Sequence, residues 1–252
     1  MTLFESIILG TVQGLTEFLP ISSSGHLVLF QSILKIEQPG HEFEILVHIG
    51  TLGSVFFIFY KDILDLLLTI KSKKSINFVT MIIIGTTPTV IIGLGFKDKI
   101  AILFENVDNV GFALIFTGIV LSLTFFIKIK RNENSFIKSF FIGLCQAIAI
   151  LPGISRSGMT ISCALLLGLS PKDAARFSFM LAIPAISGAG LLMVLDLDSS
   201  FQVPYEIIVG GVMSSFLVGI LALKLLLGLL QKGKIYFFGF YCILIGLITI
   251  LF

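Results

Sequence analysis

The 252-residue sequence predicts an all-α polytopic membrane protein, an inverted-topology repeat with six transmembrane helices plus two re-entrant helix hairpins. Three observations support this fold class. Hydrophobic residues make up 56% of the chain and mean hydropathy is +1.07, more than a soluble domain of this length can bury. The apolar segments have helix length, unlike the alternating ten-residue strands of a barrel. One broken-helix motif occurs twice.

The repeated motif places a glutamine, an apolar turn and a proline before a Ser-X-Ser-Gly sequence that opens another apolar helix. Its first copy is QGLTEFLPISSSGH, residues 13–26, and its second is QAIAILPGISRSGMT, residues 146–160. Only the first copy carries a glutamate and a histidine, Glu17 and His26, and only the second carries Arg156. We interpret the two copies as complementary halves of one site.

Each half of the chain is expected to begin with a broken helix pair that three full-length spans follow. In the first half, residues 3–19 and 22–35 are apolar helices, and neither has the roughly 20 residues that a hydrocarbon core requires. Pro20 separates them, because proline lacks an amide donor and disfavours helix in the residue before it. The spans expected next are 43–60, 77–96 and 109–127.

The second half repeats this order. Its broken pair and its three spans are expected at 136–151 and 157–168, then 172–194, 205–230 and 235–252. An odd number of crossings in each half inverts the second half relative to the first, an arrangement in which discontinuous helices meet near the midplane. We therefore expect a single membrane domain, 1–252, with repeat one at 1–130 and repeat two at 131–252.

The distribution of basic residues predicts the orientation in the membrane. If each broken pair re-enters and returns to its own side, one side receives both termini and holds Lys35, Lys97 and Lys99. The other side holds many more basic residues: Lys61, Lys71, Lys73, Lys74, Lys128, Lys130, Arg131, Lys138, Lys172, Lys232 and Lys234. By the positive-inside rule the second side is cytoplasmic, so the N- and C-termini are expected outside.

Arg156 is the first candidate site residue. A charged side chain deep in a membrane costs roughly 2.5–3.5 kcal/mol on insertion scales and usually marks function. Arg156 stands at a predicted helix start, where free backbone amides favour anions, and its guanidinium suits phosphate oxygens. Thr160, four residues later on the same helical face, is expected to add a hydroxyl. The alternative role, an ion pair with Glu17, is compatible with phosphate binding if the pair forms in the resting state.

The serines of the first motif offer a second helix start with hydroxyls and amides, for which plain helix capping is the alternative role. His26 lies three residues after Ser23, so both side chains can face one side of a helix. That spacing suits a serine–histidine pair in which histidine acts as general base or acid. His48, inside the span 43–60, lacks such neighbours and is expected to be structural, and His41 is expected to be incidental.

Glu17 is a costly carboxylate at this depth and is expected to meet a cation: Arg156, a metal ion or a protonated histidine. Gln13 lies one helical turn earlier and shares its face. A carboxylate, an amide oxygen and pyrophosphate oxygens together suit Mg²⁺ or Ca²⁺, because hard cations take oxygen ligands. Glu42 and Glu44 begin the next span, within reach of the outer mouth of the site.

The stretches EFLPISSSGH, residues 17–26, and PGISRSGMT, residues 152–160, resemble the two signature motifs of bacterial undecaprenyl-pyrophosphate phosphatases, the BacA/UppP family. The resemblance extends over essentially the whole chain, in its length, its span order and both motifs. It implies an integral hydrolase of the bacterial cytoplasmic membrane that removes the terminal phosphate of the C55 polyprenyl pyrophosphate. That reaction recycles the lipid carrier for peptidoglycan synthesis and confers bacitracin resistance.

The resemblance also implies a divalent-metal dependence, a site open to the outer face, and roles for individual residues. The family's acidic motif has glutamate or glutamine four residues before its glutamate, as in Gln13 and Glu17 here. The catalytic residues implied are Glu17, Ser23, His26 and Arg156. The phosphate-binding residues that the resemblance implies are Ser155, Arg156 and Thr160. From the two helix starts we also predict phosphate binding by Ser22, Ser24, Gly25, Ser157 and Gly158.

Two mechanisms remain open from the sequence: Ser23 attacks the terminal phosphorus, or His26 activates a water molecule. A different class of function, a transporter that flips a lipid phosphate, fits inverted repeats with broken helices. The candidate nucleophile favours hydrolysis. The expected partners are a polyprenyl pyrophosphate and the bilayer, with no nucleic acid. The sequence leaves homo-oligomer formation, metal identity and exact lipid length open.

Overall fold

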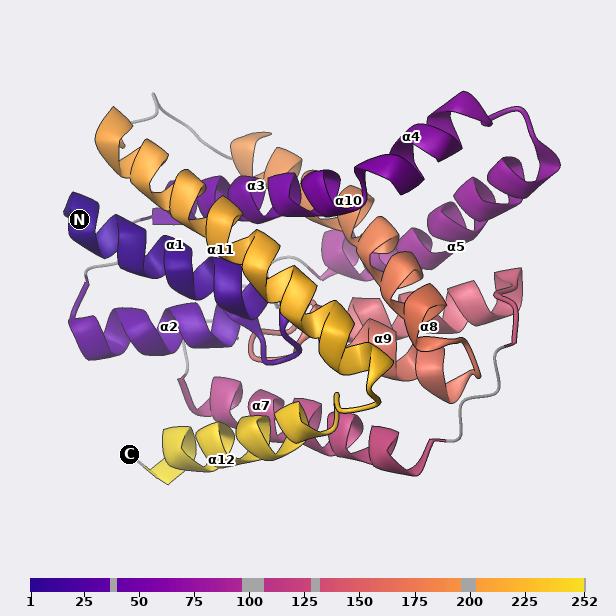
Figure 1. Ribbon diagram of the computed structural model, residues 1–252. Coiled ribbons are helices and arrows are strands. Elements are labelled where there is room, and N and C mark those ends of the chain that lie inside the picture. The colour runs from indigo at the N-terminus through magenta and orange to yellow at the C-terminus, as the bar shows by residue number, and fades with distance from the viewer. Residues whose placement is uncertain (37–39, 97–106, 128–131, 196–202, 252) are drawn as a thin grey trace.

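The computed structural model describes residues 1–36, 40–96, 107–127, 132–195 and 203–251 (Figure 1). This part of the chain contains helices and no strand, which confirms the all-α class. The helices are α1 Leu3–Phe18, α2 Ser23–Leu34, α3 Gly40–Ile58, α4 Tyr60–Leu68, α5 Lys73–Gly95, α7 Val107–Leu123, the 3-10 turn η1 Thr124–Phe126, α8 Phe136–Ile148, α9 Arg156–Leu166, α10 Pro171–Leu195, α11 Tyr205–Gln231 and α12 Phe237–Leu251.

The long apolar helices make this a multi-pass membrane protein. Those formed by residues 73–95, 109–126, 171–192 and 205–231 are each long and apolar enough to cross a bilayer. α3 and α4 meet the same criterion together, although the chain bends by 69° between them. α12 is apolar but shorter, with 15 residues.

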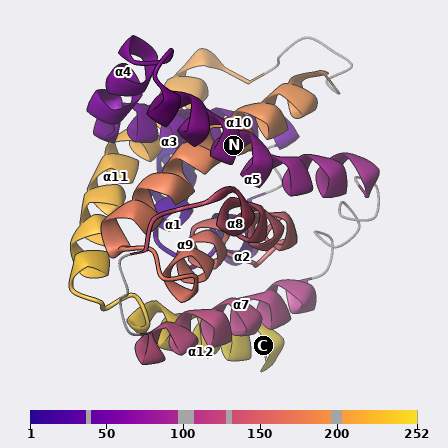
Figure 2. The ribbon, with the colours of Figure 1, turned by 90° about the vertical axis from the view of Figure 1, so that its right-hand side faces the viewer.

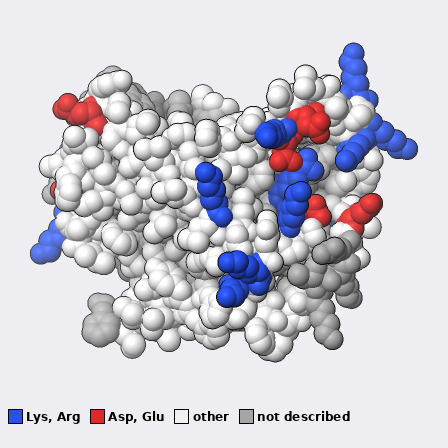
Figure 3. Space-filling model, viewed as in Figure 1, with Lys and Arg blue, Asp and Glu red and all other residues white. Residues whose placement is uncertain are grey.

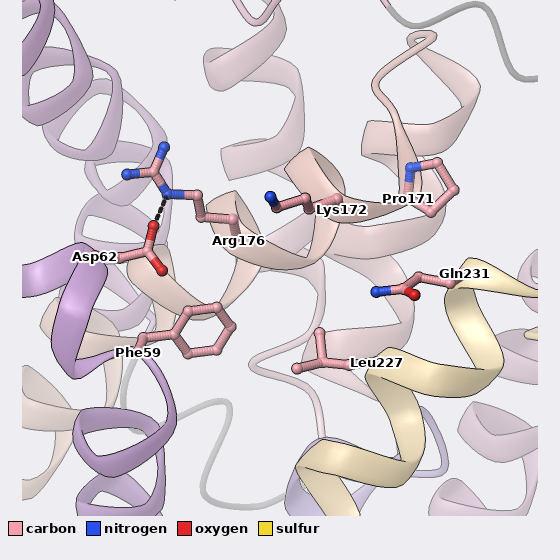
Figure 4. A pocket seen from close by; sticks show the side chains of 7 residues that line it. All are labelled: Phe59, Asp62, Pro171, Lys172, Arg176, Leu227 and Gln231. Carbon is pink, nitrogen blue, oxygen red and sulfur yellow. Dashed lines mark ion pairs between the residues drawn. The ribbon is translucent and has the colours of Figure 1, made fainter.

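α4 is an element that the sequence analysis did not anticipate. The expected span 43–60 ends at Ile58, and the chain then turns into α4, in which no residue is buried. Asp62 of α4 pairs with Arg176 of α10 at 2.6 Å, at the edge of a small cavity of about 150 Å³ that Gln231 of α11 also lines (Figure 4). A short helix with exposed leucines and charged residues is typical of a membrane interface, and here an ion pair connects it to α10.

The two broken pairs fold as helix hairpins, α1 with α2 and α8 with α9, whose breaks meet inside the molecule (Figure 1). Leu19 ends α1 in an extended conformation, as expected for the residue before Pro20. The backbone N–H of Gly153 donates to Ser24 Oγ at 3.4 Å, and Ser157 Oγ donates to the Leu19 carbonyl at 3.5 Å. The breaks of two distant motifs therefore touch directly.

The remaining helices surround these hairpins; Figure 2 shows α1, α2, α8 and α9 toward the middle of the molecule. α1 packs along α11, α8 along α5, and α7 along α12. Small residues allow these close approaches: a Cβ added to Gly14 would lie 2.6 Å from the Ser215 carbonyl oxygen, and one on Gly118 2.7 Å from the Gly239 carbonyl oxygen. Such close backbone contact is how helices associate in lipid, where apolar burial provides no driving force.

Candidate active site

A cavity of about 310 Å³ lies where the two hairpin breaks meet. Both halves of the chain contribute to it, through the ends of α1 and α8, the starts of α2 and α9, and the faces of α3, α5 and α10. The polar residues that line it are Glu17, Ser22, Ser23, Ser24, Glu44, His48, Thr89, Gln146, Ser155 and Arg156. The two sequence motifs thus contribute side chains to one cavity.

Glu17 is the centre of the polar network. Its Oε1 lies 2.6 Å from Arg156 Nη2, and its Oε2 accepts hydrogen bonds from Ser23 Oγ at 2.6 Å and from Gln13 Nε2 at 3.1 Å. The carboxylate is only 8% exposed, so the ion pair with Arg156 offsets a substantial desolvation cost. The Glu17–Arg156 pair considered in the sequence analysis is present, and it links the two hairpins.

Helices α2 and α9 both begin at the cavity, each capped by a serine. Ser22 Oγ accepts from the Gly25 N–H at 3.3 Å, and Ser155 Oγ accepts from the Gly158 N–H at 3.1 Å. Ser22 has a φ of 70°, a backbone conformation that non-glycine residues rarely adopt and that concentrates at functional sites. Two helix N-termini facing one cavity make it favourable for an anion.

Arg156 has unused hydrogen-bonding capacity. One terminal nitrogen, Nη2, binds Glu17, whereas the other, Nη1, is buried and has no hydrogen-bond partner among the described residues. A buried donor without an acceptor is unfavourable, so such a group calls for a ligand or water. Together with the two helix starts, it marks a place for phosphate oxygens.

His26 faces away from this cavity. Its Nδ1 lies 2.8 Å from the Ser22 carbonyl oxygen, its Nε2 lies 2.9 Å from Tyr241 Oη, and its ring stacks on Tyr241 of α12. Because a carbonyl only accepts, Nδ1 donates, and the neutral ring then accepts the tyrosine proton at Nε2. Ser23 bonds to Glu17 instead, so the serine–histidine pair suggested by their spacing is not formed in this structure.

His48 lines the cavity, although the sequence analysis expected it to be structural. Its Nδ1 donates to the Glu44 carbonyl at 2.7 Å, and its Nε2 lies 3.8 Å from Glu17 Oε2. A signal was present in the sequence, since Glu44 and His48 are four residues apart and therefore share a helix face. The side chains of His41 and Glu42 lie outside the described residues.

Other predicted phosphate-binding residues of the second motif are buried beside the start of α9 and do not line the cavity. Thr160 is fully buried and its Oγ1 contacts the Arg156 carbonyl at 2.8 Å and Ser178 Oγ at 2.6 Å. Ser157 is buried beside Ser155 Oγ, at 3.2 Å. Of the second motif's predicted phosphate-binding residues, Ser155 and Arg156 line the cavity, and Ser157, Gly158 and Thr160 do not.

The oxygen atoms near Glu17 are compatible with a hard divalent cation. Gln13 is fully buried and its Oε1 has no hydrogen-bond partner in the described part of the chain. Glu17 and Glu44 add carboxylates at the cavity. Among the described residues no group of three or more His, Cys, Asp or Glu side chains is arranged to hold a metal. The donors therefore fit a cation that takes further ligands from pyrophosphate oxygens.

These features define a class: a multi-pass helical membrane protein whose two broken helix pairs enclose an anion-binding cavity with a candidate nucleophile. A model of the family described as "Bacitracin resistance protein BacA" matches residues 6–248. The chain belongs to this family.

Curated relatives match this chain over nearly their whole length, among them three proteins that are each named undecaprenyl-diphosphatase. The relative from Carboxydothermus hydrogenoformans is 43% identical over 264 residues, covering 100% of this chain and 97% of the relative. The one from Halothermothrix orenii is 42% identical over 259 residues, covering 100% and 98%. The one from Methanosphaera stadtmanae is 40% identical over 272 residues, again covering 100% and 98%.

Proposed function

We propose that this protein hydrolyses undecaprenyl pyrophosphate to undecaprenyl phosphate and inorganic phosphate, which recycles the lipid carrier for peptidoglycan synthesis and confers bacitracin resistance. Membership of the BacA family and relatives named undecaprenyl-diphosphatase support this activity. The structural observation that best supports this activity is the hydrogen-bonded series Ser23–Glu17–Arg156. It places a hydroxyl, a carboxylate and a guanidinium in one cavity at two helix starts.

The geometry supports Ser23 as the nucleophile. Its hydroxyl donates to Glu17 Oε2 at 2.6 Å, so the carboxylate is placed to take the proton as Oγ attacks the terminal phosphorus. The bond from that phosphorus to the bridging oxygen breaks, and undecaprenyl phosphate leaves. Water then hydrolyses the phosphoserine, and Glu17 returns its proton to Ser23. The orientation of His26 toward Ser22 and Tyr241 favours this route over water activated by His26.

Arg156 acts by charge in this scheme. In the free protein it neutralises Glu17, and when pyrophosphate enters it turns its unpartnered Nη1, then Nη2, toward phosphate oxygens. Phosphoryl transfer involves little covalent work by the protein, so stabilising the developing charge is expected to be the largest catalytic contribution. Release of Glu17 from the ion pair at the same moment makes it a better proton acceptor. Substrate binding thereby activates the nucleophile.

Gln13 and Glu17 are the residues proposed to hold a divalent cation, Mg²⁺ or Ca²⁺. When bound, such a cation would neutralise pyrophosphate charge. Gln13 Nε2 donates to Glu17 Oε2, which orients the amide and leaves its oxygen without a partner in the described part of the chain. Glu44, from α3, brings a second carboxylate to the same cavity.

We also propose the membrane layout predicted from the sequence: six transmembrane helices, two re-entrant hairpins and an inverted repeat. The helix packing supports it. If α1 corresponds to α8, and α5 to α11, then α1 against α11 and α8 against α5 are equivalent contacts, and both are observed. α7 packs on its own counterpart, α12, as a two-fold axis in the membrane plane requires.

The charge distribution supports a site open to the outer face with both termini outside. Figure 3 shows most of the visible Lys and Arg toward the right, around α4 and the starts of α5, α8 and α10 as Figure 1 labels them. The described residues of this group are Lys61, Lys71, Lys73, Lys74, Lys138, Lys172, Lys232 and Lys234. Lys97, Lys99, Lys128, Lys130 and Arg131 fall outside the described side chains.

The activity is tested by phosphate release from a polyprenyl pyrophosphate by purified protein in detergent. We expect chelation of divalent cations to abolish release and re-addition of Mg²⁺ or Ca²⁺ to restore it. Arg156→Ala should lower kcat/KM by about 10³-fold or more, since it removes the main charge for the transition state. Arg176→Ala, which changes an arginine near the start of α10 that pairs with Asp62 and does not line the site cavity, is the matched control and should stay within about threefold. No release from folded wild type would refute the proposal.

A further inference from the structure

Gln146 is a buried polar residue that the proposed mechanism does not use. It lies near the end of α8, is 2% exposed and lines the same cavity as Ser23 and Arg156. Its Nε2 donates to Thr89 Oγ1 of α5 at 3.1 Å, and its Oε1 has no hydrogen-bond partner among the described residues. A buried amide whose oxygen lacks a hydrogen-bond partner, beside a cavity, indicates that a ligand atom supplies the missing hydrogen bond.

The Gln146–Thr89 pair can adapt to a donor or an acceptor. A hydroxyl both donates and accepts, so the amide can keep its bond to Thr89 while it presents either its oxygen or its NH₂ group to the cavity. Toward a phosphate it would present the NH₂ group. Both residues are uncharged, whereas Arg156, Glu17 and Glu44 elsewhere in the lining carry charge. The cavity therefore has a charged part and a neutral polar part.

The lining beyond this pair is apolar and roomy. Ala185, Ile186, Ala189 and Gly190 of α10 line the cavity together with Ile150. A Cβ added to Gly190, which lines the cavity, would meet only Ile45 Cγ2, at 3.9 Å. The part of α10 that lines the cavity thus leaves open space at this position.

We propose that Gln146, oriented by Thr89, binds the lipid-proximal phosphate of the substrate through its NH₂ group, and that the apolar lining from α10 takes the first isoprenoid units. The charges of a polyprenyl pyrophosphate support this assignment, which rests on the proposed function. Its terminal phosphate carries more charge and suits Arg156 and the helix starts. Its lipid-proximal phosphate is joined to the lipid by an ester bond and to the terminal phosphate by an anhydride bond, and it carries less charge, so a neutral donor suffices. The same amide then holds the phosphate of the departing product.

The test compares Gln146→Leu and Thr89→Val with wild type, using farnesyl pyrophosphate as substrate and farnesyl phosphate as a product inhibitor. A contact to the lipid-proximal phosphate is present in both the substrate complex and the product complex. Its loss should therefore raise KM for farnesyl pyrophosphate and the inhibition constant of farnesyl phosphate by the same factor, about tenfold, while kcat stays within about threefold. Inorganic phosphate, which lacks the lipid-side group, should inhibit all variants equally. Gln231→Leu, a glutamine in the small cavity near α4, is the control and should change none of these.

The chain-binding part is tested by Ala189→Phe, which fills the apolar lining. We expect KM for farnesyl pyrophosphate to rise at least about tenfold, while the inhibition constant of inorganic pyrophosphate, which has no isoprenoid chain, changes less than about threefold. Thermal unfolding in detergent checks that each variant is folded, and Thr89→Val replaces Gln146→Leu if the latter does not fold. Unchanged KM and product inhibition in both variants would overturn this inference alone. Absence of hydrolysis by wild type would instead refute the proposed function.

Discussion

Replacing Ser23 by alanine separates the two mechanisms that the sequence left open. The change removes the hydroxyl that donates to Glu17 Oε2 at 2.6 Å. It leaves the start of α2 intact, because Ser22 and not Ser23 caps that helix. Glu17 also retains Arg156 and Gln13 as partners. The loss of stability is therefore expected to be about 1 kcal/mol, one hydrogen bond, and the protein should fold.

The expected loss of activity is far larger than this loss of stability. If Ser23 is the nucleophile, its removal abolishes the covalent route, and kcat should fall about 10⁴-fold or more, equivalent to about 5.4 kcal/mol of transition-state stabilisation. If water attacks instead, Ser23 contributes one hydrogen bond, and the loss should be near tenfold. These two expected losses of kcat differ enough that a single phosphate-release assay distinguishes attack by Ser23 from attack by water.

Ser24→Ala is the matched control. Ser24 lines the same cavity, and its Oγ contacts Ser22 Oγ at 3.3 Å and the Gly153 N–H at 3.4 Å, but no bond to Glu17 is seen. Its loss should cost less than about tenfold in kcat. Rapid quenching with terminally radiolabelled substrate should trap phosphate on wild-type Ser23 and none on Ser23→Ala. A Ser23→Ala variant within tenfold of wild type, with no trapped phosphate in either protein, would refute serine attack.

Two further predictions concern how the hairpins are held. Tyr241→Phe removes the 2.9 Å hydrogen bond to His26 Nε2. It should lower the free energy of unfolding by about 0.5–1.5 kcal/mol and leave kcat within about threefold of wild type. A large loss of kcat without a change in stability would instead give His26 a direct catalytic role. Gly14→Leu places a side chain against the Ser215 carbonyl, 2.6 Å from the new Cβ, and should separate α1 from α11 at a cost of about 1–3 kcal/mol or more. Thermal unfolding in detergent measures both, and an unchanged unfolding temperature for Gly14→Leu would contradict the packing argument.

The repeated motif made much of the site predictable from the sequence. Proline after an apolar helix and serines before the next one determine where each hairpin breaks, through local backbone chemistry. Glu17 and Arg156 are each costly alone at membrane depth, so their pairing at 2.6 Å follows from electrostatics. That pairing in turn required the two breaks to meet. Local backbone chemistry was sufficient to predict where the hairpins break, and the two buried charges were sufficient to predict that the breaks meet.

The contacts of the two histidines could not be predicted from local spacing. The spacing of Ser23 and His26 allows them to share a helix face, but it does not say what that face packs against. Tyr241, more than 200 residues later, provides the partner of His26 on α12, and no local pattern reveals it. His48 was judged by its immediate neighbours, whereas its cavity position depends on how α3 packs against α1 and α10. Both contacts depend on tertiary packing.

α4 was missed for a related reason. Residues 60–68 are too short and too charged to be a span, and hydropathy alone assigns them to a loop. Their helix is fixed by the bend after Ile58 and by the ion pair of Asp62 with Arg176. A partly exposed pair of this kind contributes little stability, so its role is to orient α4 more than to stabilise the fold.

The division of charge between the repeats explains why a duplicated motif kept different residues in its two copies. A carboxylate in both copies would repel across the cavity, and an arginine in both would leave two buried cations without a partner. With Glu17 in one copy and Arg156 in the other, the free protein stays neutral at the hairpin contact, at 2.6 Å. In the proposed mechanism pyrophosphate competes with Glu17 for Arg156, so the same exchange that binds the anion frees the carboxylate beside Ser23. Placing opposite charges in the two motifs would thus couple anion binding to activation of the nucleophile.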